Sequence, residues 1–190
     1  MKKIRNIILS ILGILICIIS IKFDSQVKLF FNDPKSPLLS VPLSIITNFG
    51  FIFVVMLIIP IFMLFNKNKR AVYKLLITFL LSFILNFFVK LIVQRPRPLE
   101  TLTYPIIHIL DYSFPSTHSV VVFAMLPVLI KYLQKQKYLW VAIAFLVAFS
   151  RIYFNFHFLS DVVFGAFFGY FIGYSTLNLL EGYNGKNKRL

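Results

Sequence analysis

The stretch SRIYFNFHFLSD, residues 150 to 161, places an arginine, a histidine and an aspartate in otherwise apolar sequence. A charged side chain at bilayer depth costs about 2.5 to 3.5 kcal/mol on insertion scales, so such residues indicate a functional site. His157 and Asp161 stand four residues apart, and a helix from Phe156 onward puts both on one face, where the carboxylate can fix the tautomer of the imidazole. The stretch therefore indicates a nucleophile with an orienting carboxylate, or else a structural pair of Arg151 and Asp161 beside a packed histidine.

The composition around this stretch is that of an integral membrane protein. Of the 190 residues, 59% are hydrophobic and 23 are phenylalanine, and the mean hydropathy is +0.85, above the apolar share of soluble domains. The net charge of +14 would suit nucleic acid, but the basic residues cluster between apolar runs, as in membrane proteins. We therefore expect a single membrane domain, residues 1–190, with no nucleic-acid partner. The one cysteine, Cys17, excludes an intrachain disulfide.

Long apolar runs predict an all-α, polytopic protein with six transmembrane helices in a bundle. A span needs about 20 apolar residues, and the expected helices cover residues 1–22, 41–65, 71–93, 118–133, 138–150 and 157–180. The first run is too long for a signal peptide and lacks a cleavage site of small residues, so we interpret it as a helix. Pro60 is expected to kink the second helix, because it removes a backbone hydrogen bond.

Polar segments complete the layout: an interfacial outer loop at 23–40, an outer active-site loop at 94–117 and a cytoplasmic tail at 181–190. Lysine and arginine accumulate on the cytoplasmic side of membrane proteins. Most of them lie at the chain ends and in the turns at 66–74 and 131–137, whereas the opposite side holds Asp24, Asp33, Glu100, Asp111 and Asp161. We expect a multi-pass protein of the cell membrane with cytoplasmic termini and an outward-facing active site.

In this layout three separate stretches meet on the outer side and together indicate a phosphate site. Lys90, Arg97 and Arg151 supply three positive charges. The turn Pro115-Ser116-Thr117-His118 precedes an expected helix, whose first backbone N–H groups can bind the same anion together with the Ser116 hydroxyl.

The two histidines add what phosphoryl transfer needs besides charge stabilisation. It requires an in-line nucleophile and a proton for the leaving oxygen, and His118 and His157 can supply both. No set of Cys, His and carboxylate residues has the tight spacing of a zinc site. We therefore expect neither a metal nor a cofactor.

These three blocks resemble those of the type 2 phosphatidic acid phosphatase family. They are a lysine, six residues and Arg-Pro; then Pro-Ser-x-His; then Ser-Arg, five residues, a histidine, three residues and an aspartate. The blocks run from Lys90 to Asp161, and the six-helix layout extends the likeness to nearly the whole chain. The resemblance implies a metal-independent phosphatase that acts through a phosphohistidine.

By this resemblance His157 is the nucleophile, Asp161 orients it, and His118 is the general acid. The resemblance implies that the phosphate is held by Lys90, Arg97, Ser116, Thr117 and Arg151. Thr117 departs from the pattern, because the family usually has glycine there, and glycine lets a backbone approach a ligand closely. We interpret the threonine as tuning the site, with its hydroxyl capping the following helix or contacting phosphate.

Three other residues have weaker claims on the site. Arg95 lies outside the matched spacing, and we give it at most a contact with a second phosphate. His108 lies in the polar loop, where a solvated or substrate-gating role is more plausible than catalysis. Trp140 near a span end is interpreted as an interface anchor.

The leading functional hypothesis is a lipid phosphatase of the outer leaflet, acting on a polyprenyl diphosphate such as undecaprenyl diphosphate or on a phosphatidyl-type lipid such as phosphatidic acid. The loops are too small to build a domain for soluble substrates, so a membrane lipid is the expected partner and no protein partner is evident. A phosphotransferase with the same intermediate is an alternative. A non-catalytic anion channel or binding protein would explain the arginines but not the pairing of His157 with Asp161.

Overall fold

The computed structural model describes residues 2–32, 35–99 and 112–186, and in these ranges all regular structure is helical. The elements are α1 (Lys2–Phe30), α2 (Pro37–Ile46), α3 (Phe49–Phe53), the π-turn η1 (Val54–Ile58), α4 (Ile59–Phe65), α5 (Lys69–Val93), α7 (Thr117–Tyr132), the 3-10 turn η2 (Gln134–Gln136), α8 (Lys137–Tyr153) and α9 (Leu159–Lys186).

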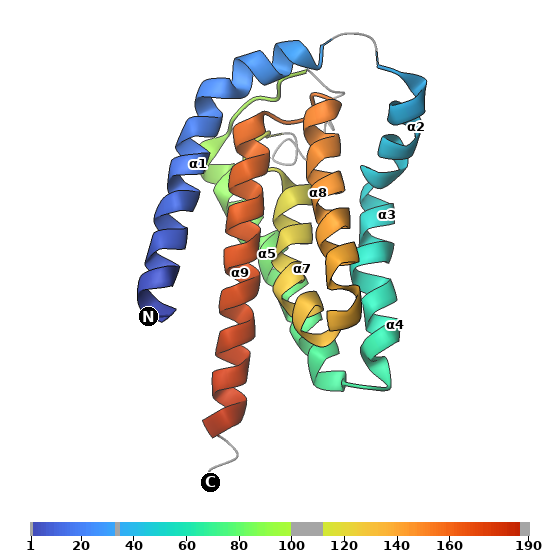
Figure 1. Cartoon of the computed structure of the whole chain (residues 1–190), viewed down its shortest axis with the longest axis vertical. Helices are drawn as coiled ribbons and strands as arrows, with labels where there is room; N and C mark the ends of the chain where they lie inside the picture. Colours follow the sequence, from blue (N-terminus) through green and yellow to red (C-terminus); the bar gives the residue numbers. More distant parts are fainter. Residues whose placement is uncertain (1, 33–34, 100–111, 187–190) are drawn as a thin grey trace.

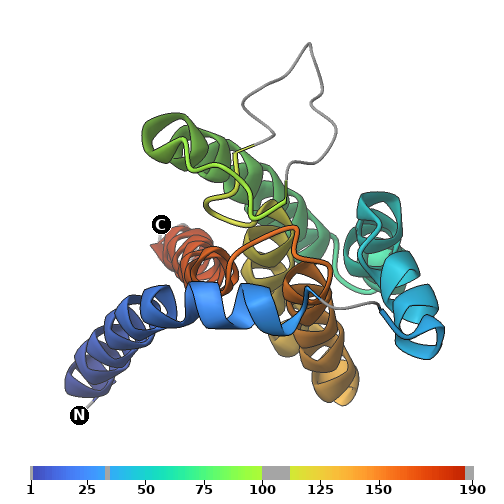
Figure 2. The same cartoon turned by 90° about the horizontal axis from the view of Figure 1, so that it is seen from above.

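Helix α7 is the centre of the bundle. Every residue on it from Ser119 to Leu129 is buried, and it contacts α5, α8 and α9, which lie around it (Figures 1 and 2). Helix α1 packs against α9, and α2 packs against α8 on the other side of the bundle. The core is therefore formed mainly by the chain that follows residue 69, with Ile52, Met56, Leu57 and Leu64 added from α3, η1 and α4.

A stripe of glycines on α9 allows its close approach to α7. The residues are Gly165, Gly169 and Gly173, spaced four apart. A Cβ built on Gly169 would lie 2.2 Å from the carbonyl oxygen of Val120. Small residues at this spacing let two membrane helices bring their backbones together and gain dispersion energy. This contact places the start of α7 directly beside the start of α9.

The candidate site and the basic turns lie at opposite ends of the bundle. The turns between α4 and α5 and between α7 and α8 lie at the lower end in Figure 1, as does the end of α9. The connection from α8 to α9 lies at the upper end. The positively charged turns are thus grouped together and lie far from His157, as the charge pattern predicts.

Two described helices are long and apolar enough to cross a membrane, Lys69–Val93 and Leu159–Gly182. The pair Pro37–Ile46 and Phe49–Phe65 forms a third candidate if its 55° bend is counted as a break within one span. Helix α7 is apolar but shorter. An all-helical membrane bundle is thus supported, whereas the count of six spans stays a prediction.

Several predicted boundaries differ from those observed. Residues 23–30 continue α1, and α2 begins at Pro37, so most of the expected outer loop at 23–40 is helical. Helix α9 likewise runs to Lys186, into the expected tail. Residues 100–111 of the expected active-site loop, including His108, lie outside the described residues.

The bend in the second predicted helix is not at Pro60. It lies between α2 and α3, where the Asn48 side chain accepts hydrogen bonds from the backbone N–H groups of Gly50 and Phe51 and so begins a new helix. Pro60 instead lies in the first turn of α4, after the π-turn. The wider π-turn next to it is the kind of local adjustment by which membrane helices accommodate a proline.

Candidate active site

His157 lies in the turn between α8 and α9, and a backbone carbonyl sets its tautomer. Its Nδ1 is 2.8 Å from the carbonyl oxygen of Ser113. A carbonyl can only accept, so Nδ1 carries the proton and Nε2 of the neutral ring carries the lone pair. The nearer carboxylate oxygen of Asp161 is 3.7 Å from Nδ1, and the Ser113 hydroxyl donates to that same oxygen. Ser113 therefore lies between the histidine and the aspartate that the sequence pairs directly.

The predicted cations surround His157 closely enough to affect its ionisation. Burial, followed by the positive charges of Arg151, Arg97 and Lys90, lowers the pKa of His157 well below its ordinary range. The imidazole is consequently neutral at pH 7 and keeps its lone pair for attack. The predicted nucleophile and the three predicted phosphate-binding cations thus share one site.

Backbone carbonyls hold two of these cations in place. Lys90 is 1% exposed, and its ammonium group donates to the carbonyl oxygen of Tyr112. Arg97 Nη1 donates to the carbonyl oxygen of Phe156 at 3.3 Å. The Arg97 contact is with the turn that contains His157, and the Lys90 contact is with the residue before Ser113, which binds His157.

Arg151 is buried beneath the same turn and is anchored by Thr47. Its Nη1 donates to Thr47 Oγ1 at 2.6 Å, and its guanidinium carbon lies 4.6 Å from the centre of the Phe156 ring. The Arg151 Nε atom is buried with no hydrogen-bond partner in the described part of the chain. A buried guanidinium donor without a partner is costly, and a bound anion would satisfy it.

His118 lies in the first turn of α7 on the other side of the site. It hydrogen-bonds to the backbone of Thr47 and interacts electrostatically with Arg151, His157 and Arg97. The Phe49 ring packs edge-on against the imidazole, with ring centres 5.3 Å apart. The break between α2 and α3 therefore supports both His118 and Arg151 through Thr47.

Ser116 is the last residue before α7 and Thr117 is the first residue of that helix, but their contacts differ from the expected ones. The Ser116 N–H donates to the backbone carbonyl oxygen of Asp161 at 3.1 Å, and its hydroxyl accepts from Ser119 at 3.2 Å. Thr117 does not cap α7; Oγ1 accepts from Asn86 Nδ2 at 3.0 Å. In place of glycine, the threonine thus ties α7 to α5, one helical turn before Lys90.

Sequence reasoning missed several residues that hold the site together. Ser113, Thr47 and Asn86 are neutral and carry no charge or spacing signal that would single them out. Asp24 did carry such a signal, because it is an acidic residue at the end of a long apolar run. In the structure it is 5% exposed. Arg95 was undervalued, since its guanidinium contacts two carboxylates.

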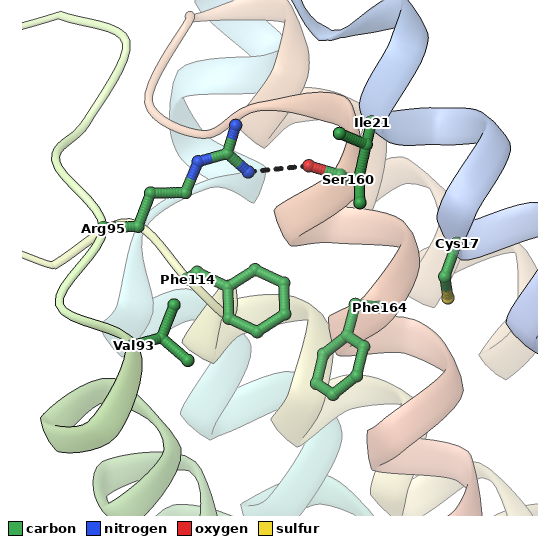
Figure 3. A pocket seen from close by; sticks show the side chains of 7 residues that line it. All are labelled: Cys17, Ile21, Val93, Arg95, Phe114, Ser160 and Phe164. Atoms are coloured by element: carbon green, nitrogen blue, oxygen red, sulfur yellow. Dashed lines mark hydrogen bonds between the residues drawn. The ribbon is translucent and has the colours of Figure 1, made fainter.

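A cavity of about 310 Å³ lies beside the site, between α1, α5 and α9 (Figure 3). It is lined by Cys17, Ile21, Val93, Arg95, Phe114, Ser160 and Phe164. The rings of Phe114 and Phe164 are tilted by 38° to each other at a centre distance of 4.6 Å and form an apolar wall. Arg95 and Ser160 provide the polar end, next to Asp161.

The arrangement of two histidines, an aspartate and buried cations has a counterpart among known families. The family model described as "PAP2 superfamily" matches residues 70–183, which include every predicted site residue. The chain belongs to the PAP2 superfamily. This result confirms the resemblance to the type 2 phosphatidic acid phosphatases.

Two curated PAP2-type relatives are similar in sequence. The chain is 32% identical over 107 residues to the bacitracin transport permease protein BcrC of Bacillus licheniformis, an alignment that covers 55% of this chain and 53% of BcrC. It is 29% identical over 169 residues to phosphatidylglycerophosphatase B of Bacillus subtilis, covering 82% of this chain and 80% of the relative. The chain thus matches about half the length of BcrC and most of the phosphatase.

Two solved structures share the fold. The structure of Aquifex aeolicus LpxE has a TM-score of 0.67 at 27% identity and covers 82% of this chain and 95% of that one. The structure of the transmembrane PAP2-type phosphatidylglycerolphosphate phosphatase from Bacillus subtilis has a TM-score of 0.67 at 24% identity and covers 93% and 96%. The helices outside residues 70–183 are therefore part of a fold that PAP2 proteins share.

Proposed function

We propose that this PAP2 protein is a membrane lipid phosphatase that hydrolyses a lipid phosphomonoester or diphosphate through a phosphohistidine at His157. The observation that carries the proposal is the state of His157. Its Nδ1 proton is held by the Ser113 carbonyl, and burial and nearby cations keep the ring neutral. A neutral imidazole with a fixed tautomer and an available Nε2 lone pair is suited to attack phosphorus.

The reaction proceeds in two displacements. In the first, the Nε2 lone pair attacks phosphorus and the bond from phosphorus to the leaving oxygen breaks. His118, which takes up a proton when the phosphate anion offsets the nearby cations, gives that oxygen a proton. In the second, water attacks the phosphohistidine, its proton passes to His118, and the P–N bond breaks to return Nε2 of His157. Lys90, Arg97 and Arg151 stabilise the equatorial oxygens, and the Arg151 Nε without a protein partner is one donor for them.

The charge of the phosphate is met by side chains in this scheme, so turnover needs no divalent cation. Three buried or partly buried cations face one anion, and each charge-assisted hydrogen bond is short and strong at low dielectric. Ser116 and Thr117 complete the phosphate-binding turn before α7.

The substrate is an amphiphile with its phosphate at the upper end of the bundle. The site lies where the candidate spans α5 and α9 end and begin, so a headgroup there leaves its tail among apolar helices. A phosphatidyl-type lipid, as the name of the Bacillus subtilis relative indicates for that protein, and a polyprenyl diphosphate are the two classes that fit. The grouping of basic turns at the opposite end favours a site outside the cytoplasm.

Phosphate release from purified protein in detergent tests this function. A panel of phosphatidylglycerophosphate, phosphatidic acid and undecaprenyl diphosphate should include at least one substrate, turned over equally with chelator present. His157→Ala should release none. Loss of turnover on chelation, restored by magnesium or zinc, would contradict the scheme, and consumption of substrate without free phosphate would indicate transfer to another acceptor.

A further inference from the structure

Arg95 follows the end of α5 and joins two carboxylates that come from opposite ends of the sequence. Its Nη1 lies 2.8 Å from Asp161 Oδ1, and its Nη2 lies 2.8 Å from Asp24 Oδ2. The same Nη1 donates to Ser160 Oγ at 2.7 Å, the bond drawn in Figure 3. The guanidinium carbon also lies 4.0 Å from the centre of the Phe158 ring, a cation–π contact that helps to hold the side chain in place.

Asp24 brings α1 into this network. Its carboxylate accepts from the Ser160 N–H at 2.8 Å and from Ser160 Oγ at 2.6 Å, at the first turn of α9. The same end of α1 is tied to the turn before His157, because Asn155 Nδ2 donates to the carbonyl oxygens of Lys28 and Phe31, both at 3.1 Å. Asp24 lies outside the residues that match the family model.

The hydrogen bonds of the Asp161 carboxylate connect Arg95 to His157 through Ser113. Asp161 is fully buried; Oδ1 accepts from Arg95, and Oδ2 accepts from the Ser113 hydroxyl and from the Phe158 N–H at 2.9 Å. Ser113 in turn holds Nδ1 of His157 with its carbonyl. Arg95 also accepts the Ser113 N–H at its own carbonyl, at 2.7 Å. The connection runs from α1 through Arg95 and the carboxylate to the imidazole.

We propose that Arg95 is a positioning residue for the reaction at His157 and that Asp24 of α1 holds Arg95 in place. The inference rests on the proposed function. Without the guanidinium, the Asp161 carboxylate loses the partner of one oxygen and can rotate away from Ser113, and the imidazole loses its alignment. Because the guanidinium of Arg95 is bound to two carboxylates and a hydroxyl, it contributes to the rate of attack and not to phosphate binding.

The test compares kcat and KM of purified Arg95→Gln, Asp24→Asn and the double variant on the best lipid substrate. A misplacement of about 1 Å in an active site costs about 100-fold in rate, so kcat should fall about 10- to 100-fold for Arg95→Gln, with KM within about twofold of the parent. Asp24→Asn should lose less, and the double variant should be no slower than Arg95→Gln, because Asp24 acts through Arg95. Arg70→Gln at the exposed, opposite end of α5 is the matched control and should match the parent.

Chemical rescue separates positioning from folding. Arg95 is 27% exposed in its side chain and borders the cavity of Figure 3, so guanidinium ion can reach the space that Arg95→Ala leaves. Millimolar guanidinium should restore part of kcat in this variant and none in His157→Ala. Rescue should not alter the detergent-extracted yield of folded protein.

Different results would contradict the positioning role of Arg95 and the proposed phosphatase function. If the parent turns over lipid phosphate but Arg95→Gln keeps its kcat, the positioning role is wrong and the function stands. An increase in KM at constant kcat would make Arg95 a substrate contact instead. Additive losses in the double variant would show that Asp24 does not act through Arg95. A parent protein inactive on every lipid phosphate would refute the function itself.

Discussion

Thr47 Oγ1 accepts a hydrogen bond of 2.6 Å from Arg151, although the two residues are 104 positions apart in the chain. Thr47 lies where α2 gives way to α3, at the 55° bend. Its backbone also hydrogen-bonds to His118. A break in a helix thus orients the proposed phosphate-binding Arg151 and the proposed general acid His118 together.

Thr47→Val removes the hydroxyl but keeps the shape and the backbone contact to His118. A hydrogen bond to a charged group contributes about 1.5 to 3 kcal/mol, so kcat/KM on a lipid phosphate should fall about 10- to 150-fold. Thr47→Ser keeps the hydroxyl and should stay within a few-fold of the parent. Equal losses in both variants would show that the methyl group matters, not the bond to Arg151.

The two histidines should differ in their dependence on the leaving group. General acid catalysis contributes about 10²- to 10⁴-fold, and an acidic phenol leaves without needing a proton. His118→Ala should therefore lose far more rate on a lipid alcohol phosphate than on an aryl phosphate, with a diphosphate in between, whereas His157→Ala should be inactive on all three. Residual aryl phosphatase activity in His157→Ala, with none in His118→Ala, would exchange the two roles.

The pH profile follows from the lowered pKa of His157. An imidazole whose proton affinity is reduced by burial and by cations stays neutral, and nucleophilic, as the pH falls below about 6.5, the usual pKa of histidine. The kcat/KM for an aryl phosphate, corrected for the ionisation of the substrate, should show no acidic limb with an apparent pKa near 6.5. A limb at that value would mean that His157 is solvated in the free enzyme.

The glycine stripe on α9 predicts a stability effect with an internal control. A Cβ at Gly169 would lie 2.2 Å from a backbone oxygen of α7, and that oxygen can move only if the helix moves. A Cβ at Gly182 would have no atom within 4 Å. Overpacking costs about 1 to 3 kcal/mol, so Gly169→Ala should lower the thermal midpoint in detergent clearly. Gly182→Ala should leave it unchanged or raise it slightly; equal midpoints would refute the close packing of α7 on α9.

The proposed orientation can be tested by labelling in intact cells. In a Cys17→Ser background, a membrane-impermeant thiol reagent should label Ser36→Cys, which is exposed at the start of α2, but not Asn66→Cys, which is exposed after α4. Both should be labelled once the cells are opened. The reverse pattern would place the active site in the cytoplasm.

Much of the helical layout was predictable because it depends on local composition. The apolar run at 71–93 predicts α5, observed as Lys69–Val93, nearly to the residue. One boundary failed because a distant partner sets it, and another because a local cap outweighs a proline. Residues 23–30 contain charges, which predicts a loop. In the structure Asp24 forms an ion pair with Arg95, and helix α1 continues across it. Pro60 has the strongest local signal for a kink, but the bend forms at Asn48, where a side-chain cap begins a new helix.

The sequence by itself determined the family of this protein, a helical membrane protein of the PAP2 superfamily, and predicted a phosphate site with two histidines, an aspartate and three cations. Residue types and short spacings carry that information, because charges in apolar sequence must be neutralised or used. Only the tertiary structure decided which groups bind the charged side chains of this site. The spacing selects Arg97 over Arg95, but it does not predict what Arg95 binds. In the structure Arg95 contacts Asp24 and Asp161, whereas Arg97 contacts the turn of His157. The tautomer of His157 depends on the carbonyl of Ser113, 44 residues away, and such a contact exists only once α5, α7 and α9 have packed.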